Sequence, residues 1–502
     1  MNEISYVIVQ AGGKGTRMKQ LTRNKPKALV PVQNLPMLFH LFRAYPDKKF
    51  IVIGDYKYDV LKRYLATFAD VDYRLVEGTG HTGTCAGLQE ALESIPDNTP
   101  FMLIWSDLVL PAGFEFPKSE GNFLGVSKDF RCRWSYVNGE LVETPSETQG
   151  VAGCFIFRSR DIFQDIPESG EFVRYLKGKG IVFQELPLYG THEYGLAEEY
   201  AQLAQCRCRP FNRITVKQDT IIKEGIDDQG RELAQAERAW YQRVEGAAFR
   251  SIPKIYSYEP LEMERIHGKN IYEYTNISKT QKNKILESII RCLKDVHALE
   301  DAAADFESCE DAYLDKTIRR TEKIRGLVPF ADEPVITING RSCRNIFFHW
   351  DALRSAMRKY YPKRFQLLHG DCTFSNLMLR DADFSPVLID PRGYFGTTPF
   401  LGDTAYEWAK LYYSIVGNYD QFNLKRFELE IDEHEILLRI ASNGWEDMEE
   451  RFFELLKDEI SERQIKLIHA IIWLSLTTYA WEDYDSICGA FYNGLYYLEE
   501  VL

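Results

Sequence analysis

Apolar and polar positions follow two different patterns along the chain, and the pattern changes near residue 206. In the first two hundred residues, short β-branched runs at 6–9, 50–55 and 101–105 alternate with stretches of helical spacing, such as 59–68. Strand, helix and strand in this order predict a largely parallel sheet with helices on both faces. Ligands of such sheets collect at the carboxyl ends of the strands.

The second pattern begins with two strand-like runs, 211–216 and 220–223, which predict a hairpin, and with a helical stretch at 234–244. After about residue 275 the pattern is mostly helical and rich in aromatic residues, except that 366–390 holds two apolar stretches around a polar loop. A small lobe of sheet and helix before a larger helical lobe is a kinase-like arrangement. The sequence therefore predicts two abutting domains, residues 1–205 and 206–502.

Composition narrows the class of protein. A formal net charge of -13 argues against nucleic-acid binding, and no apolar run is long enough to cross a bilayer, so no membrane insertion is expected. The ten cysteines are scattered, and the first residues lack the features of a signal peptide, which together predict reduced thiols and a cytoplasmic location. Cys206 and Cys208 form the only close pair, without the second cluster that a metal site would need.

A Gly-rich loop, QAGGKGTRM at residues 10–18, directly follows the first strand-like run. Its glycines leave room for backbone N–H groups to approach a triphosphate, and Arg17 can hold phosphate oxygens through its planar guanidinium. The segment NKPKALVPV follows at residues 24–32, and its Lys25 and Lys27 can neutralise the phosphates that leave as pyrophosphate. The other loop residues expected to bind the nucleotide are Gly12, Gly13, Gly15 and Thr16.

These two motifs resemble the NTP-transferase family, which includes sugar-1-phosphate nucleotidyltransferases and bacterial phosphocholine cytidylyltransferases, over about residues 5–205. The resemblance implies a Rossmann-like (GT-A type) α/β domain in which an acceptor phosphate attacks the α-phosphorus of an NTP. It also implies two acidic residues that hold Mg²⁺, and these match Asp107 and Glu193. The family usually has Asp at the second position, although Mg²⁺ accepts either carboxylate.

Three further positions concern the base and the acceptor. The segment GHTGTCAGL at residues 80–88 resembles the base-recognition segment of the family, which places Gly83 and Thr84 beside the nucleobase or ribose; a helix-capping turn is the alternative. Gly153 matches the glycine that lines the acceptor pocket. The family's Glu-Lys-Pro motif is ETP at residues 143–145 here, without the lysine that grips the acceptor phosphate. Lys128 is the candidate replacement, and a plain hexose 1-phosphate acceptor does not follow.

The segment LLHGDCTFSNLM at residues 367–378 carries the strongest chemical signal. An Asp followed five residues later by Asn places a base and a metal ligand on one loop, and VLIDPRG at 387–393 ends an apolar strand in a second acid. Asp371 would accept the proton of a hydroxyl, while Asn376 and Asp390 would hold Mg²⁺. A polar turn between two core strands explains the apolar flanks but not three such residues at this spacing.

These residues resemble the aminoglycoside phosphotransferase and choline kinase family, over about residues 208–502. The resemblance implies an α+β protein-kinase-like fold and phosphorylation of small-molecule hydroxyls by ATP, or sometimes GTP. It makes Lys223 the strand lysine that contacts the α- and β-phosphates and Glu237 its ion-pair partner; an ordinary surface pair is the alternative. Residues 262–268 fit the hinge beside adenine, and no Gly-rich loop precedes Lys223. Asp403 is expected to cap a helix.

Aromatic residues crowd the helical region after the second acid. Their side chains could form a cage for a quaternary ammonium such as choline, but packing in the core is the favoured interpretation. The residues concerned are Tyr406, Trp408, Tyr412, Tyr413, Trp473, Tyr479 and Trp481.

The two chemistries are consecutive in one kind of pathway. The hypothesis is a bifunctional enzyme that needs Mg²⁺ at both sites, phosphorylates a small alcohol or sugar with ATP and then transfers a nucleotidyl group to the phosphate, giving a precursor for surface polysaccharide. The missing acceptor lysine favours an amino alcohol or polyol and CTP as the second NTP. A sugar 1-kinase using UTP, GTP or dTTP is one alternative, and a single active domain with a regulatory partner domain is another. The intact Asp371, Asn376 and Asp390 argue against an inactive kinase, and a scaffold with two vestigial sites would have lost acids where this sequence shows only replacements.

Overall fold

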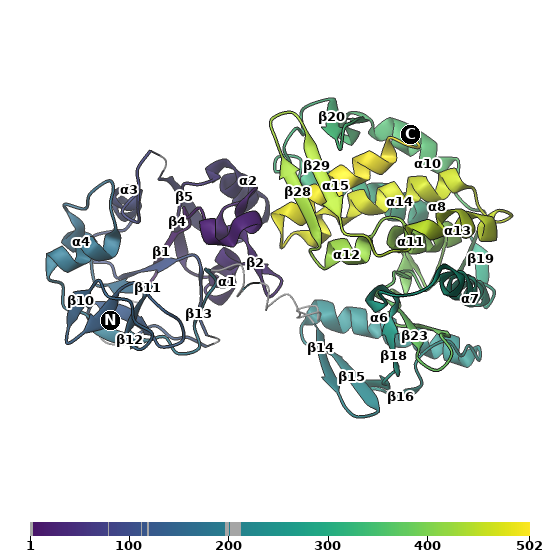
Figure 1. Ribbon diagram of the computed structural model, residues 1–502, viewed down its shortest axis with the longest axis horizontal. Coiled ribbons are helices and arrows are strands. Elements are labelled where there is room, and N and C mark those ends of the chain that lie inside the picture. The colour runs from purple at the N-terminus through teal and green to yellow at the C-terminus, as the bar shows by residue number, and fades with distance from the viewer. Residues whose placement is uncertain (1–3, 79, 112, 118–119, 196–199, 201–211) are drawn as a thin grey trace. The chain divides into compact units, whose positions relative to one another are not determined.

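The computed structural model describes residues 4–78, 80–111, 113–117, 120–195, 200 and 212–502. Figure 1 shows the chain as helices and strands, which divide into two compact units. The first unit is formed by nearly all residues before Arg207, and the second by nearly all residues from there on. The predicted domain boundary, Cys206 and Cys208 lie outside the described residues.

A nine-stranded sheet forms the core of the first unit. Four of its strands run parallel in the order β6-β1-β4-β5, with β5 at the edge, and β11 extends the sheet antiparallel to β6. The predicted parallel sheet is therefore confirmed at its centre, while β11, β8, β9 and β10 make the whole sheet mixed. The strands are β1 (Tyr6–Gln10), β4 (Lys49–Gly54), β5 (Tyr73–Glu77), β6 (Phe101–Trp105), β8 (Phe123–Ser127), β9 (Ser135–Val137), β10 (Glu140–Val142), β11 (Gly150–Phe157) and β12 (Gln184–Pro187).

Helices cover both faces of this sheet, which explains why its central strands are continuously apolar. Ile8 and Ile51 share a buried cluster with α3 and α4, whereas Phe50 points to the opposite face and packs on Phe42 of α1, with ring centroids 4.7 Å apart. The helices are α1 (Met37–Ala44), α2 (Tyr58–Phe68), α3 (Leu88–Glu93) and α4 (Phe172–Lys179), with 3-10 helices η1 (Thr16–Thr22), η2 (Lys27–Leu29) and η3 (Arg160–Phe163). Two short pairs complete the unit: β2 (Pro31–Val32) with β3 (Leu35–Pro36), and β7 (Leu108–Val109) with β13 (His192–Glu193).

The second unit begins with a four-stranded antiparallel sheet in the order β14-β15-β17-β16. The predicted hairpin is confirmed: the N–H of Lys217 donates to the carbonyl of Thr220 (2.9 Å), which closes the turn between β14 and β15. The predicted helix is α6, longer than expected at both ends. The bounds are β14 (Asn212–Val216), β15 (Thr220–Gly225), α6 (Asp228–Gly246), β16 (Ile255–Tyr258), β17 (Leu261–Glu264) and β18 (Gly268–Asn270).

The remainder of the second unit is largely helical, as predicted. Its helices are α7 (Lys279–His297), α8 (Phe306–Cys309), α9 (Lys316–Lys323), α10 (Trp350–Arg358), α11 (Thr404–Ile415), α12 (Tyr419–Asn423), α13 (Glu449–Leu456), α14 (Glu462–Leu476) and α15 (Tyr484–Leu498), with short turns η4 (Ile271–Glu273), η5 (Glu310–Asp315), η6 (Ile346–Phe348), η7 (Glu446–Met448) and η8 (Thr477–Ala480). Among the described helices, none combines the length and apolarity needed to cross a bilayer.

One sequence prediction is wrong in this region. Residues 366–390 are not its only extended segment, because two hairpins far apart in sequence join into a four-stranded sheet in the order β21-β20-β29-β28. These strands are only four or five residues long, so their apolar positions give a weak signal beside the surrounding helices. The strands are β20 (Val335–Ile338), β21 (Arg341–Arg344), β28 (Phe427–Ile431) and β29 (Ile436–Ile440), besides β19 (Asp301–Ala303), β22 (Arg364–Leu367), β23 (Leu377–Arg380), β24 (Pro386–Leu388), β25 (Tyr394–Phe395), β26 (Thr398–Pro399) and β27 (Leu401–Gly402).

Gly153 interrupts the pairing of β11 with β8, and the structure requires a glycine there. Its φ is +73°, and a Cβ at this position would come within 2.0 Å of the Trp105 ring. We expect Gly153→Ala to lower the free energy of unfolding of the first unit by about 2–4 kcal/mol, from backbone strain and overpacking together. Gly178→Ala is the matched control: this glycine lies in α4 with nothing within 4 Å of a Cβ, and the change should stabilise the helix by about 0.5–1 kcal/mol.

Urea unfolding followed by hydrogen–deuterium exchange of peptides from β6 and β11 measures both changes. Equal protection of these strands in Gly153→Ala and the unchanged protein would contradict the close contact with Trp105.

Candidate active sites

The Gly-rich loop leaves β1 and crosses the end of β4, where the N–H of Ala11 donates to the carbonyl of Ile53 (2.8 Å). Two of its glycines are required by close approach. A Cβ on Gly12 would lie 2.9 Å from that of Asp55, and Gly15 has a φ of +59° and would meet Thr22 at 2.9 Å. A Cβ on Gly13 would meet nothing within 4 Å. The loop is therefore packed on one side and open on the other, as a phosphate-binding loop needs to be.

A hollow of about 430 Å³ adjoins this loop. Three of its lining side chains are basic and none is acidic, so it favours anions. It is lined by Lys14, Thr16, Lys19, Gln20, Thr22, Arg23 and Tyr56.

Asp107 and Glu193 are brought together by the short antiparallel pair of β7 and β13. Glu193 lies opposite Leu108 in this pair, and the N–H of Tyr194 donates to the carbonyl of Asp107 (3.1 Å). The two predicted metal ligands thus come to the same place although the segments are far apart in sequence. The longer side chain of Glu193 is compatible with this arrangement.

Each of these carboxylates has a basic partner from the predicted loop segments. The ammonium of Lys27 pairs with Oδ2 of Asp107, and the guanidinium of Arg17 lies 3.9 Å from the carboxylate of Glu193. The other oxygen of Asp107, Oδ1, is buried without a hydrogen-bond partner. Lys25, in contrast, is almost completely buried, with 2% of its surface exposed, and its contact with a nucleotide stays a prediction.

The predicted base segment is docked beside the end of β1, where the side-chain amide of Gln10 donates to the carbonyl of Thr84. The hydroxyl of Thr84 accepts from the N–H of Phe172 (2.8 Å), and Gly83 packs so tightly that its Cβ would lie 2.3 Å from the carbonyl oxygen of Gly170. The helix that follows, α3, is capped by Gly87 without a side-chain hydrogen bond. The close packing of Gly83 agrees with the alternative of a capping turn with small residues for packing, so contact of this segment with the base stays a prediction.

On the predicted acceptor side, Gly153 lies against the ring of Trp105, which precedes Asp107 by two residues. The ammonium of Lys128 lies 5.3 Å from the centroid of the exposed Tyr189 ring. Glu143, in the segment that replaces the family's lysine motif, is tied to Arg133 (2.6 Å) and Arg174 (2.7 Å). This carboxylate therefore holds local structure together.

In the second unit, the loop between β22 and β23 brings the predicted catalytic residues together. The side-chain amide of Asn376 donates to the carboxylate of Asp371 (3.1 Å) and to its carbonyl (2.8 Å). The N–H of Ile389 donates to the carbonyl of Asn376 (3.1 Å), so Asp390 is anchored next to the same loop. Lys410 of α11, which sequence reasoning missed, lies 3.0 Å from the carboxylate of Asp371.

Lys223 of β15 lies between two carboxylates, that of Glu237 on α6 (2.7 Å) and that of Asp390 (2.6 Å). The side chains of Lys223 and Glu237 are only 11% and 5% exposed, so they are not an ordinary surface pair, while the contact of Lys223 with phosphates stays a prediction. Burial alone would lower the pKa of Lys223, but the charges of Asp390 and Glu237 outweigh it and raise the pKa. Burial raises the pKa of Glu237 to about 7, against the opposing charge of Lys223.

The predicted hinge spans the end of β17 and the start of β18. At its start, Glu262 accepts hydrogen bonds from Lys217 (2.9 Å) and Thr220 (2.8 Å), which tie it to the β14–β15 turn. Glu264 pairs with Arg380 of β23 (2.6 Å), which links the small sheet to the strand after the catalytic loop.

Glu407, which sequence reasoning missed, supports the loop that carries Asp371. Its two carboxylate oxygens accept the N–H groups of His369 (2.8 Å) and Gly370 (2.8 Å), and the side chain is fully buried. Burial opposes its charge, but hydrogen bonding and charge from His297, with further help from His369, leave the pKa of Glu407 lowered. A Glu on an apolar helix, one turn after an expected cap, was the available signal.

Asp403 caps α11, as predicted: it accepts from the N–H of Ala405 (2.9 Å) and from the hydroxyl of Tyr313 (2.8 Å). The aromatic side chains of α11 are buried, and Tyr413 packs on Trp473 with ring centroids 4.7 Å apart. Packing in the core is thus confirmed for α11, and its aromatic residues do not form an open cage.

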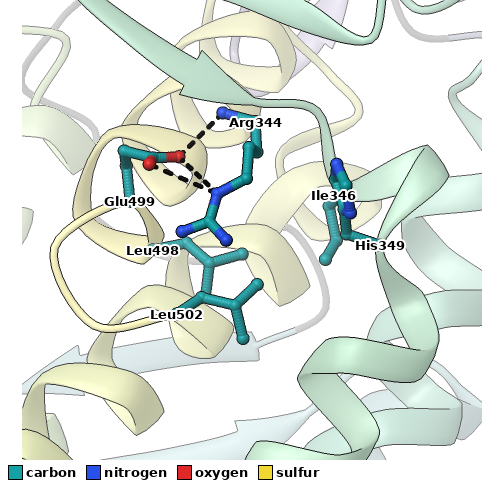
Figure 2. Close-up of a pocket in the computed structure, with 6 residues that line it drawn as sticks. All are labelled: Arg344, Ile346, His349, Leu498, Glu499 and Leu502. Carbon is teal, nitrogen blue, oxygen red and sulfur yellow. Dashed lines mark hydrogen bonds and ion pairs between the residues drawn. The ribbon is translucent and has the colours of Figure 1, made fainter.

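Figure 2 shows a different pocket of the second unit, between the end of β21 and the C-terminal helix α15. The guanidinium of Arg344 closes it by pairing with Glu499 (3.1 Å), beside Leu498 and Leu502. None of the predicted site residues lines this pocket.

Two family models match the chain. Residues 7–113 match the MobA-like NTP transferase domain, and residues 214–449 match the phosphotransferase enzyme family. Together with the two observed folds, these matches confirm the predicted fold class, a Rossmann-like unit followed by a kinase-like unit.

Similar proteins cover only part of the chain. A UTP–glucose-1-phosphate uridylyltransferase of Haloferax volcanii is 35% identical over 111 residues, which is 21% of this chain and 44% of that protein. A glucose-1-phosphate cytidylyltransferase of Salmonella typhimurium is 28% identical over 153 residues, 24% of this chain and 60% of that protein. The chain therefore spans roughly half the length of these relatives. A solved CTP:phosphocholine cytidylyltransferase of Streptococcus pneumoniae is 21% identical with a TM-score of 0.34, covering 40% of this chain and 98% of that one.

The Glu407 contacts yield a stability prediction. Glu407→Gln keeps the shape but replaces an ionised acceptor of two N–H groups, so we expect the free energy of unfolding of the second unit to fall by about 2–3 kcal/mol at neutral pH. Because the pKa is lowered below its ordinary value of 4.5 in the folded state, the ionised carboxylate stabilises the fold above that pH. This stabilisation is lost as the pH falls through the folded-state pKa.

The difference in the free energy of unfolding between Glu407→Gln and the unchanged protein should therefore become smaller in acid. We would measure this difference by urea unfolding at neutral pH and below about pH 4. Hydrogen–deuterium exchange of peptides from the loop that carries Asp371 gives the local readout. Glu428→Gln, at an exposed position of β28, is the control and should behave as the unchanged protein. A difference that grows in acid would contradict an ionised Glu407.

Proposed function

We propose that this chain, which joins an N-terminal MobA-like NTP transferase domain to a C-terminal phosphotransferase domain, is a bifunctional kinase and nucleotidyltransferase. The kinase phosphorylates the hydroxyl of a small alcohol or sugar with ATP. The transferase then joins the resulting phosphate to the nucleotidyl group of a second NTP and releases pyrophosphate. The observation that carries the proposal is the meeting of Asp371, Asn376 and Asp390 at one point of a kinase-like fold.

In the kinase, Asp371 accepts the proton of the attacking hydroxyl. Asn376 keeps its carboxylate in place through the 3.1 Å hydrogen bond, and the ammonium of Lys410 lies 3.0 Å from the same carboxylate. Lys223 contacts the α- and β-phosphates, with Glu237 fixing the position of its ammonium. Asp390 is half exposed and lies within reach of Lys223, so this lysine can exchange a carboxylate for phosphate when ATP binds.

In the transferase, the open side of the Gly-rich loop receives the triphosphate, with Gly12, Gly13, Gly15 and Thr16 supplying backbone N–H groups. Arg17 and Lys27 balance the charge that develops on the leaving pyrophosphate. The docked segment at Gly83 and Thr84 borders the base, and Gly153 and Lys128 lie on the acceptor side.

Both sites fit Mg²⁺ in the way that nucleotide enzymes hold it. No cluster of three or more His, Cys, Asp or Glu side chains occurs among the described residues, and Mg²⁺ is commonly held by one or two carboxylates and completed by substrate phosphates and water. Asp107 has one buried carboxylate oxygen without a hydrogen-bond partner, and Glu193 lies beside it. Asn376 and Asp390 form the corresponding pair in the kinase. When bound, Mg²⁺ neutralises phosphate oxygens and draws nucleotide and acceptor together.

The finer assignment rests on the sequence. CTP is favoured as the second NTP because the transferase lacks the acceptor lysine of sugar-type members, and cytidylyltransferases stand among the similar proteins. UTP, GTP or dTTP with a sugar 1-phosphate is the second candidate, which the similar uridylyltransferase favours. The activated product would serve surface polysaccharide synthesis in the cytoplasm.

Two variants test the two-site proposal. Asp371→Ala should lower phosphorylation of the free alcohol at least about 100-fold, since it removes the general base, and should spare nucleotidyl transfer to supplied phosphate ester. Asp107→Ala should do the reverse. A mass-spectrometric screen with ATP, CTP, UTP, GTP, dTTP and pooled alcohols and sugars measures both products. If either change removed both activities while the fold remained intact, the two sites would not be independent.

A titration with metal tests the Mg²⁺ assignment separately. Removal of divalent cations with EDTA should abolish both reactions, and added Mg²⁺ should restore them. Asp107→Asn should raise the Mg²⁺ concentration needed for nucleotidyl transfer by about 10-fold or more while leaving that of the kinase unchanged. Full transferase activity in EDTA would exclude Mg²⁺ at Asp107.

A further inference from the structure

Four basic side chains lie within electrostatic range of one another in the second unit, and two of them, Lys410 and Arg392, act on Asp371. Lys316 and Arg320 come from α9, Arg392 from the loop after Asp390, and Lys410 from α11. Helix α14 packs against both α9 and α11. Such a concentration of cations next to a catalytic carboxylate needs a physical reason, since basic groups repel one another.

Hydrogen bonds fix the positions of two of these cations. Arg392 donates to the hydroxyls of Tyr406 (2.9 Å) and Tyr394 (3.1 Å). Arg320 donates to the carbonyl of Ser475 (2.8 Å) and to its hydroxyl (3.2 Å). All of these partners are uncharged, so the two guanidinium groups are held in place without being neutralised.

Few acidic groups balance the cluster. Among the residues that the structure describes, no carboxylate forms an ion pair with Lys316, Arg320 or Arg392. Asp371 is shared by Lys410 (3.0 Å) and, at longer range, Arg392. Asp311 acts on Lys316 but pairs with Arg319 (3.6 Å).

The electrostatics of Lys316 follow from this imbalance. Burial lowers its pKa well below the ordinary value, and the charges of Arg392 and Arg320 lower it further. The pKa of Arg320 is lowered for the same two reasons, burial first and the charge of Arg392 second. Lys316, Arg320 and Arg392 are each half-buried, so a ligand can reach them. An anionic group placed among them would favour their charged forms.

We propose that Lys316, Arg320 and Arg392 bind an anionic group of the phosphoryl acceptor, so that the kinase acts on a small alcohol or sugar that already carries a phosphate or a carboxylate. This inference rests on the proposed kinase function and specifies its substrate class. Lys410 and Arg392 border Asp371, where the acceptor hydroxyl must lie, while Lys316 and Arg320 extend the cluster along α9. The planar guanidinium groups match the oxygens of phosphate and carboxylate.

Phosphoryl transfer to an anionic acceptor follows the same steps as transfer to a neutral alcohol. The acceptor oxygen forms a bond to the γ-phosphorus of ATP, the bond from that phosphorus to the β,γ-bridging oxygen breaks, ADP leaves, and the hydroxyl proton passes to Asp371. A quaternary ammonium acceptor would be repelled by the cluster, and Tyr394 and Tyr406 are already engaged by Arg392. The cations thus favour a charged acid over choline as the acceptor.

Matched acceptor sets test the proposal with the full chain. Each set consists of one polyol or sugar in a neutral form, a phosphate-bearing form and a carboxylate-bearing form, with choline and ethanolamine as cationic members. ADP release gives kcat and KM, and titration calorimetry gives binding without turnover. We expect kcat/KM for one anionic form to be at least about 100-fold higher than for its neutral counterpart. A factor of this size corresponds to the free energy of charge-assisted hydrogen bonds. The phosphate and carboxylate arms then identify which anion is recognised.

Lys316→Met is the diagnostic variant. It should raise KM for the anionic acceptor about 10-fold or more while leaving KM for ATP within about two-fold. Lys323→Met, at an exposed position of the same helix, should change neither. A rise in KM for ATP instead would mean that the cluster serves the nucleotide, and the proposal would be wrong.

The outcomes separate this inference from the kinase proposal. Binding of anionic acceptors that Lys316→Met weakens, without phosphorylation, would keep the anion site and reject the kinase. Preferred turnover of neutral or cationic acceptors would keep the kinase and overturn the anion site. If no anionic form were either bound or turned over, the proposed anion site would also be wrong.

Discussion

A lysine ammonium pairs with each of three carboxylates on which the two proposed sites depend. Lys27 pairs with Asp107 in the first unit, and Lys410 with Asp371 and Lys223 with Asp390 in the second. Burial disfavours a charge that has no partner, and each lysine supplies a partner of opposite charge. In the proposed mechanism, phosphates or metal replace that partner when a nucleotide binds. The strand and loop geometry around each site serves to bring these opposite charges together.

The catalytic loop of the second unit depends on a further buried carboxylate. Glu407 fixes the backbone N–H groups of His369 and Gly370 from below, while Asp420 accepts the N–H of Ser375 (2.8 Å) on the other side of Asp371. Breaking such contacts leaves buried donors unsatisfied, which costs more than the net value of the hydrogen bonds. The precise placement of Asp371 and Asn376 therefore comes from residues that touch no substrate. Removing them is expected to misplace the loop while the chemistry of its side chains stays intact.

The sequence predicted local features well and long-range ones less well. The strands at β1, β4 and β6, the helix α2 and the β14–β15 hairpin follow from local periodicity, and the kinase motif follows from spacing on one loop. The β20–β29 pairing and the meeting of β7 with β13 depend on segments far apart in sequence, which periodicity cannot connect. Glu193 was found only through a family resemblance. Lys316 and Arg320 were missed because α9, with the sequence KTIRRTEK, has the pattern of a solvated helix.

The acceptor is constrained from both units independently. In the first unit, the position of the family's acceptor lysine has none, and Lys128 instead lies over an exposed tyrosine ring, where its ammonium can reach solvent. In the second unit, Arg392 acts on Asp371, the proposed base, without forming an ion pair among the described residues. A cationic amino alcohol or a neutral sugar would leave the cations of the proposed anion site uncompensated, whereas an acceptor with its own anionic group would neutralise them. The same group would remain on the phosphorylated product, so the transferase would receive a more highly charged acceptor than a hexose 1-phosphate. Under this proposal, Lys128 takes the place of the family's acceptor lysine from a more exposed position. That position suits an acceptor with two anionic groups, because such an acceptor needs a cation at a different place than a hexose 1-phosphate does.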